Sequence, residues 1–146
     1  MKVPFKLLRG SAIAGVAFLL ATPALAADID VTISGINSTS GRIMCRVFNE
    51  RSGFPIRGAL QTVHGAIAEG TSRCRFSDLP EGRYAIAVLH DANSNDKLDK
   101  SFIGLPTEGL AFSETGKPAF GVPSFSSAAF RLGADGSRLS LRMSYP

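Results

Sequence analysis

The sequence predicts an all-β protein: an antiparallel sandwich of about seven strands with one long ordered loop. Three observations lead to this expectation. Apolar and polar residues alternate with the period of two that marks strands with one buried face. Turns rich in Gly, Pro, Asn and Asp separate these short segments, and no segment after residue 26 shows a clear helical apolar period. Short strands with frequent turn signals are typical of a β-sandwich.

The first 26 residues are expected to be a secretory signal peptide rather than part of the domain. Three cations precede a short apolar run over residues 11–21, and Ala24-Leu25-Ala26 forms an A-x-A cleavage site. The run is too short to span a bilayer comfortably. We expect cleavage after Ala26, no stable membrane insertion of the mature chain, and one sandwich domain over residues 27–146 in the periplasm or outside the cell. A retained N-terminal anchor is the alternative.

Removing this leader changes the charge of the domain. The chain has 16 Lys and Arg residues and 12 Asp and Glu residues, and three of the cations but none of the anions lie in the leader, which leaves 13 − 12 = +1. No basic stripe with interleaved aromatic residues remains. Nucleic acid is therefore excluded as an expected partner.

Two cysteines fall in the alternating segments. The predicted strands, in chain order, are residues 29–33, 42–48, 59–67, 71–76, 83–90, 126–132 and 138–145. Cys45 and Cys74 lie in the second and fourth of these strands, each beside apolar residues of one face. Export favours a disulfide between them, which the chain-entropy model values at about 3–4 kcal/mol. Two buried free thiols that do not meet are the alternative, and a catalytic cysteine is the least favoured interpretation.

The later strands have their own signals. Residues 83–90 are apolar on both faces, which predicts a central strand. The turn before this strand places Tyr84 where its hydroxyl could cap a corner of the sandwich. Residues 126–132 and 138–145 are expected to form a hairpin around a turn at residues 134–137.

A long segment without a strand pattern, residues 91–124, begins with a D-x-N-x-N-x-x-x-D motif. Ca²⁺ takes six to eight oxygen ligands, often from alternate side chains of a tight loop and one carbonyl. The motif predicts a calcium site whose ligands are the side chains of Asp91, Asn93, Asn95 and Asp99 and the carbonyl of Lys97.

Two positions depart from the usual calcium loop. Position 6 is normally Gly and is Asp96 here, and position 12 is normally a bidentate Glu and is Phe102 here. Glu108 is the nearest carboxylate that could complete the site. An Asx-rich turn closed by its own hydrogen bonds is the alternative to a calcium loop.

His90 precedes this motif and has two interpretations. Beside Asp91 it could act as a metal ligand or a general base. It also ends the strand on the face of Tyr84, Ile86 and Val88, which favours a hydrogen-bonded structural role. No serine lies in a nucleophile-elbow motif.

The order of motifs resembles a bacterial exported family, domain of unknown function 2141. The matching segments are F-S-D-L-P-E-G-R-Y-A-I at 76–86, the motif at 91–99, G-L-P-T-E-G at 104–109, and F-G-V-P-S-F at 120–125. The family usually has Gly where Asp96 stands. The resemblance implies a secreted or periplasmic β-sandwich and no established enzymatic activity. The L-P-x-G-x-Y turn gives a weaker, fold-level likeness to immunoglobulin-like and transthyretin-like sandwiches, including carboxypeptidase-regulatory-like domains.

Two function classes follow from these features. The first is an exported, non-catalytic β-sandwich protein in which a calcium-stabilised loop presents a binding surface for an envelope protein, a glycan or a small ligand. The second is a small metal-dependent hydrolase that uses His90, Asp91 and Glu108. An enzyme should bring these three side chains together in a concave pocket, whereas a binding module should turn His90 inward.

Overall fold

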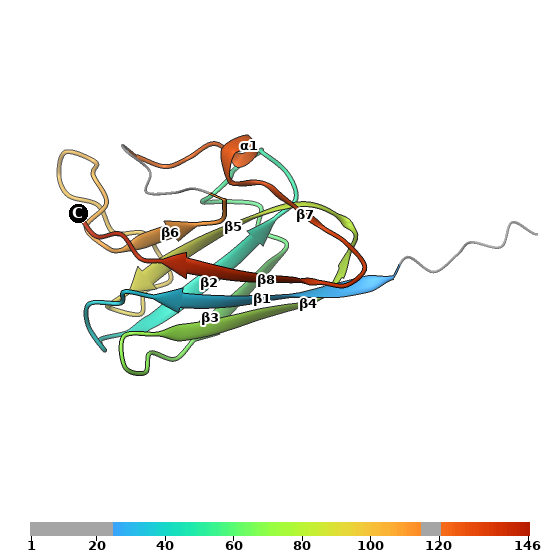
Figure 1. Cartoon of the computed structure of the whole chain (residues 1–146). Helices are drawn as coiled ribbons and strands as arrows, with labels where there is room; N and C mark the ends of the chain where they lie inside the picture. Colours follow the sequence, from blue (N-terminus) through green and yellow to red (C-terminus); the bar gives the residue numbers. More distant parts are fainter. Residues whose placement is uncertain (1–24, 115–120) are drawn as a thin grey trace, which may run out of the picture.

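The computed structural model describes residues 25–114 and 121–146, and these form two β-sheets packed face to face (Figure 1). One sheet has three strands in the order β4-β1-β8: β1 is Ala26–Ser34, β4 is Ser72–Pro80 and β8 is Ser137–Arg142. The other has the order β3-β2-β5-β6, with β7 also paired to β5. Its strands are β2 (Arg42–Phe48), β3 (Gln61–Gly65), β5 (Gly82–Asp91), β6 (Leu110–Phe112) and β7 (Phe130–Leu132).

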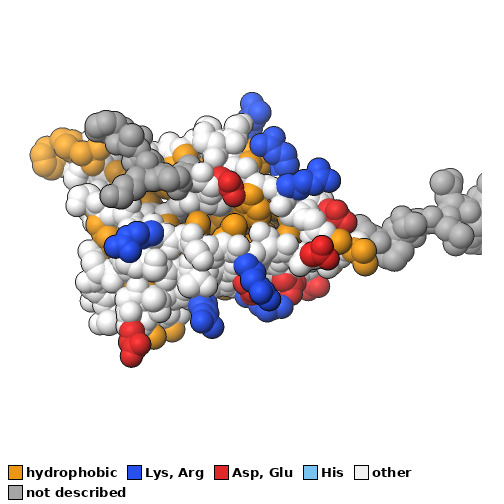
Figure 2. Space-filling model, viewed as in Figure 1, with side chains coloured by type: hydrophobic (Ala, Val, Ile, Leu, Met, Phe, Trp, Pro, Cys, Tyr) orange, Lys and Arg blue, Asp and Glu red, His pale blue; other side chains and the backbone are white. Residues whose placement is uncertain are grey.

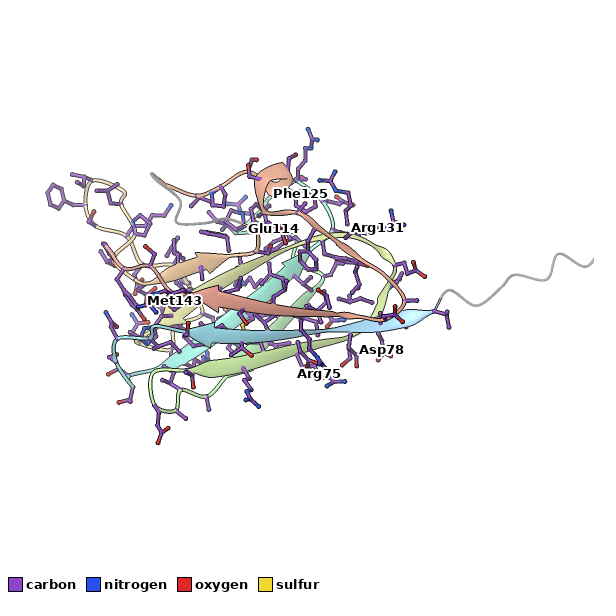
Figure 3. All side chains as sticks on the ribbon, in the orientation of Figure 1. Arg75, Asp78, Glu114, Phe125, Arg131 and Met143 are labelled. Carbon is purple, nitrogen blue, oxygen red and sulfur yellow. A yellow bond between two sulfur atoms is a disulfide. The ribbon has the colours of Figure 1, made fainter. Side chains whose placement is uncertain are left out.

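The main core lies between the sheets and follows the alternation in the sequence. Ile29, Val31 and Ile33 of β1 are buried there, and so are the alternate residues of β2 and β5 that face them. Side chains fill the space between the two layers (Figure 3). Almost every residue of β5 is buried, because the far face of its sheet is also covered. The predicted all-β sandwich and the central position of β5 are therefore confirmed.

The connection between β4 and β5 turns from one sheet to the other. β4 ends at Pro80 and β5 begins at Gly82, yet the two strands belong to different sheets. The Tyr84 hydroxyl donates to the carbonyl of Pro80 at 2.8 Å across this corner. The predicted corner cap is confirmed, and burial raises the pKa of the Tyr84 phenol.

The Cys45–Cys74 disulfide joins the two sheets across the core. Its Cα atoms lie 6.4 Å apart and it links β2 to β4 over 29 positions of sequence. Since both side chains are buried, each alternates inward on its strand as the pattern predicted. The disulfide is confirmed, and the two alternatives to it are excluded.

Three details of the sequence prediction are wrong. The last two predicted strands do not form a hairpin, because β7 pairs with β5 while β8 pairs with β1, in parallel. Residues 125–128 form a short helix, α1 (Phe125–Ala128), capped by the side chain of Ser124. The long segment contains a strand, β6, which pairs with β5. For β6, β7 and β8 the tertiary partner decides the pairing.

Several expectations concern residues outside the described part. Residues 1–24 include most of the predicted leader, and residues 115–120 belong to the predicted long loop. Ala26, the last residue before the expected cleavage position, already pairs with Pro80 at the start of β1. Within residues 25–114 and 121–146, no helix is long and apolar enough to cross a membrane.

Candidate functional site: the 92–109 loop

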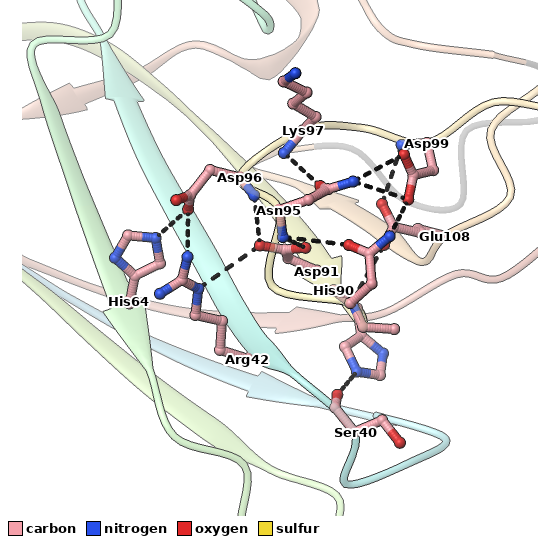
Figure 4. Close-up of polar contacts among 12 residues, drawn as sticks. Ser40, Arg42, His64, His90, Asp91, Asn95, Asp96, Lys97, Asp99 and Glu108 are labelled. Carbon is pink, nitrogen blue, oxygen red and sulfur yellow. Dashed lines mark hydrogen bonds and ion pairs between the residues drawn. The ribbon is translucent and has the colours of Figure 1, made fainter.

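The 92–109 loop, which connects β5 to β6, starts from a buried carboxylate (Figure 4). Asp91 ends β5 and is 0% exposed. Its Oδ1 accepts a hydrogen bond from the backbone N–H of Asn95 and its Oδ2 accepts one from Asp96, each at 2.9 Å. Arg42 on the neighbouring strand β2 places Nε 3.6 Å from Oδ2. The first turn of the loop is thus folded around the Asp91 carboxylate, whose charge faces a guanidinium.

Asp96 ties the same turn to the sheet from outside. Its backbone has φ of 60°, the left-handed conformation that Gly adopts most readily. Its Oδ1 lies 2.8 Å from Nη2 of Arg42 and 2.9 Å from Nε2 of His64 on β3. The hydrogen bond from His64, followed by the charge of Arg42, holds the pKa of the Asp96 carboxyl below its usual value. The side chain that replaces Gly therefore links the loop to β2 and β3.

Three of the predicted calcium ligands form one polar cluster. Asn93 donates from Nδ2 to Oδ2 of Asp99 at 2.6 Å, and Asn95 donates from Nδ2 to both carboxylate oxygens of Asp99 at 3.1 and 3.2 Å. Asn95 also accepts from the backbone N–H of Lys97 at 2.9 Å. The spacing of the motif does bring these side chains together, as an Asx-rich turn closed by its own hydrogen bonds.

Glu108 closes the other end of the loop. Its Oε1 accepts from the backbone N–H of Ala92 and its Oε2 accepts from the backbone N–H of Asp99, each at 3.1 Å. The N–H of Thr107 also donates to the carbonyl of Asp99 at 2.9 Å. Both oxygens of this buried carboxylate are thereby used on the loop backbone. Glu108 holds the two ends of the loop together rather than pointing into the Asp99 cluster.

The donor set fits calcium only in part. Asn93, Asn95 and Asp99 converge, but the amide oxygens of Asn93 and Asn95 already accept from the backbone N–H groups of Asn95 and Lys97. Directing these oxygens toward a cation beside the Asp99 carboxylate would break both bonds. The carboxylates of Asp91 and Glu108 already accept two backbone N–H groups each. Among the residues that the structure describes, no group of three or more His, Cys, Asp or Glu side chains is placed to hold a metal ion.

His90 faces the opposite side of β5 from Asp91. It is 2% exposed, and its neighbours on that face, Tyr84, Ile86 and Val88, belong to the core between the sheets. Nε2 lies 2.9 Å from the carbonyl of Ser40 and must donate to it, which leaves Nδ1 to accept from the Tyr145 hydroxyl at 2.8 Å. His90 is therefore a buried, hydrogen-bonded side chain, as its place in the alternation predicted, and it points away from Asp91 across β5.

Beyond these anchors the loop ends in an exposed apolar tip, which we define as Phe102, Ile103 and Leu105. The tip is a tight turn: the N–H of Gly104 donates to Ser101 at 2.9 Å and the N–H of Ser101 donates to Leu105 at 2.8 Å. Phe102 is 101% exposed, Ile103 64% and Leu105 58%. Figure 2 shows hydrophobic side chains on the end of the molecule where this loop protrudes in Figure 1.

A groove lies behind the loop, over the outer face of the five-stranded sheet. It has a volume of about 350 Å³. Its floor comes from β2, β5 and β6, and its walls come from the segment after β2 and from the 92–109 loop; the lining includes Met44, Arg46, Ile56, Ala87, Leu89, Lys97, Lys100, Leu110 and Val122. This groove was not predicted from the sequence. The signal for it was present, because Met44 and Phe48 put apolar side chains on the face of β2 opposite Cys45.

Comparison with known proteins identifies a family but no activity. No curated protein and no solved structure gives a significant match to the chain, so the likeness to transthyretin-like domains stays a prediction. Residues 31–140 match a family described as uncharacterized protein conserved in bacteria (DUF2141). That match covers most of the sandwich, from β1 to β8, and includes the Asp91 anchor, the 92–109 loop and Glu108. The chain belongs to the DUF2141 family.

Proposed function

We propose that this chain is an exported, non-catalytic binding module, and that the apolar tip of the 92–109 loop contacts its partner. The observation that carries the proposal is the combination of a fixed loop and an unburied tip. Carboxylates at both ends of the loop accept four backbone hydrogen bonds, from the N–H groups of Asn95, Asp96, Ala92 and Asp99. An apolar tip held in solvent by such anchors is typical of an interaction surface.

The non-catalytic assignment is supported by the contacts of the three candidate catalytic residues, each of which makes its hydrogen bonds in a different place. His90 bridges a carbonyl and a tyrosine, Asp91 folds the first turn of the loop, and Glu108 joins its ends. A hydrolase would need at least two of these groups beside a common substrate atom. Export is supported by the disulfide, since such bonds persist mainly in oxidising compartments.

A binding experiment tests the role of the tip. The mature chain, residues 27–146, is immobilised and exposed to a periplasmic extract of the source cell, with and without calcium. We expect a specifically retained envelope protein or glycan, and we expect its loss with Phe102→Ser. Leu60→Ser is the matched control, because Leu60 is also an exposed apolar residue and lies outside the tip. Equal retention by Phe102→Ser and the wild type would contradict the proposal.

Calcium is proposed as an additional clamp on the same loop, held by Asn93, Asn95, Asp99 and the Lys97 carbonyl. Support comes from the convergence of the first three side chains. Thermal melts with millimolar calcium and with chelator provide the test. A higher melting temperature in calcium is expected for the wild type and not for Asp99→Ala. Identical wild-type melts under both conditions would exclude the metal and leave the hydrogen-bonded turn as the whole explanation.

A further inference from the structure

The groove behind the 92–109 loop combines an apolar floor with charged residues, of which three are cations and one, Asp96, is an anion. Met44, Ala87, Leu89 and Leu110 present aliphatic side chains from three strands along its floor. Its volume of about 350 Å³ lies at the lower end of the range typical of small-molecule sites, roughly 300–1,000 Å³. The groove is therefore large enough for a short alkyl chain and too small for a polypeptide domain.

Cations predominate among the charged residues that line the groove. Within the part of the chain that the structure describes, the ammonium groups of Lys97 and Lys100 make no hydrogen bond or ion pair. The only lining carboxylate of the described residues, on Asp96, is already engaged by Arg42 and His64 on the sheet.

Arg46 adds an unusual feature to the floor of the groove. Its Nη1 donates to the carbonyl of Ile56 at 2.9 Å, whereas its Nε is buried without a hydrogen-bond partner. A buried unpaired N–H group on a cation is costly, and an anionic acceptor is the group that would relieve it most. Arg46 itself lines the same groove as the two lysines.

We propose that this groove binds a small amphiphile that has an alkyl chain and a single anionic headgroup such as a carboxylate. The alkyl chain lies over the aliphatic floor, and the headgroup is held by Arg46 together with Lys97 or Lys100. Charge complementarity selects this ligand class, because the ammonium groups of Lys97 and Lys100 line the groove and have no anionic partner among the described residues. The site is separate from the apolar tip, whose residues Phe102, Ile103 and Leu105 are not among its lining residues.

Calorimetric titration of the mature chain with octanoate, decanoate and the matching alkanols tests this proposal. All four are used below the concentrations at which they form micelles. Burial of each added methylene should tighten binding about fourfold until the groove is full. The carboxylates should bind roughly tenfold more tightly than the alkanols, since a hydrogen bond to a charged group is worth more than a neutral one.

Two charge variants distinguish the contribution of the ligand's headgroup from that of its alkyl chain. Lys100→Gln and Arg46→Gln should weaken decanoate binding several-fold and leave decanol binding unchanged, whereas Arg73→Gln, an exposed cation on the other sheet, should change neither. Equal affinities for alkanoate and alkanol, or insensitivity to both charge variants, would overturn the anionic-headgroup assignment. Absence of binding by all four ligands at millimolar concentration would overturn the site itself.

Two further variants locate the ligand. Ala87→Leu fills the floor and Ile56→Glu places a negative charge on the half-exposed wall, so each should weaken decanoate at least tenfold. Thermal melts establish which of them is folded, and Ile56→Glu serves if Ala87→Leu does not fold. Unchanged binding by a folded variant would place the ligand elsewhere and refute the proposal. Phe102→Ser should bind decanoate normally, which separates failure of the groove from failure of the tip.

Discussion

The buried carboxylate of Asp91 offers the sharpest test of how the 92–109 loop is held. Asp91→Ala removes the acceptor of two backbone N–H groups at 2.9 Å and the more distant of the two carboxylates beside Arg42, at 3.6 Å. A hydrogen bond to a charged group contributes about 1.5–3 kcal/mol. Water can reach the freed N–H groups once the loop opens, because Asn95 and Asp96 are exposed residues. We therefore expect the lower end of the sum, a loss of about 3 kcal/mol in the free energy of unfolding.

Graded variants and a control make this magnitude interpretable. Asp91→Asn keeps one acceptor oxygen and should cost about half as much as Asp91→Ala. Glu50→Ala removes an exposed carboxylate for which the structure records no partner, and it should change the unfolding free energy by less than about 0.5 kcal/mol. Urea unfolding followed by circular dichroism measures all three, with an unchanged dependence on urea showing that only native stability has shifted.

The result that would refute the reasoning is equally specific. If Asp91→Ala were no less stable than Glu50→Ala, the two hydrogen bonds would not hold the loop in solution. Amide hydrogen exchange gives an independent measurement of the same bonds. The amides of Asn95 and Asp96 should lose protection in Asp91→Ala, while amides in the centre of β5 should follow the global stability.

Three other predictions concern the framework around the loop. Replacing Cys45 and Cys74 by Ala should lower the unfolding free energy by about 3–4 kcal/mol, measured in urea, and reduction of the wild type should reproduce this loss. Tyr84→Phe should lower the free energy of unfolding by about 1 kcal/mol, because it removes the hydrogen bond to Pro80. Burial raises the pKa of the Tyr84 phenol in the folded state, so the stabilisation by the protonated phenol is complete below the unfolded pKa of about 10 and is lost as the pH rises through the folded pKa. The stability of Tyr84→Phe should therefore decline less steeply at alkaline pH than that of the wild type. Gly41→Ala should lose about 2 kcal/mol or more of stability in thermal melts, because the Gly41 backbone is left-handed and an added Cβ would clash with the backbone of Asp91 and Ala92. Gly104→Ala is the control: its backbone is also left-handed, but an added Cβ would contact nothing, so it should lose less stability.

The strands and the loop motif were accessible to sequence reasoning because they depend on local pattern. Alternation in β1 sets which side chains are buried, and the apolar character of both faces identified β5 as central. The D-x-N-x-N-x-x-x-D spacing brought Asn93, Asn95 and Asp99 together as expected. The strand partners of β7 and β8 could not be predicted from the sequence. A turn at residues 134–137 is compatible both with a hairpin and with a connection between two sheets, and the structure has the connection.

In the candidate site too, the sequence predicted which residues lie near one another but not the contacts they make. The sequence placed Glu108 near the motif but could not say that both its oxygens would accept backbone N–H groups. It showed that Asp96 replaces the usual Gly, but the contacts with Arg42 and His64 exist only because β2 and β3 lie beside the loop. The groove was missed for a related reason: its floor and walls come from segments far apart in the chain, and no local pattern encodes their meeting.

The sequence by itself determined the β-sandwich class, the corner at Tyr84, the inward-facing cysteines and the Asx-rich turn, since each follows from side-chain alternation or from hydrogen bonds within a few residues. The tertiary structure alone decided which sheet each late strand joins, which distant groups His90 and Glu108 contact, and how the apolar tip and the cationic groove are presented. These features require contacts between residues distant in sequence, whose free energies depend on packing and burial across the assembled sheets and not on local propensity.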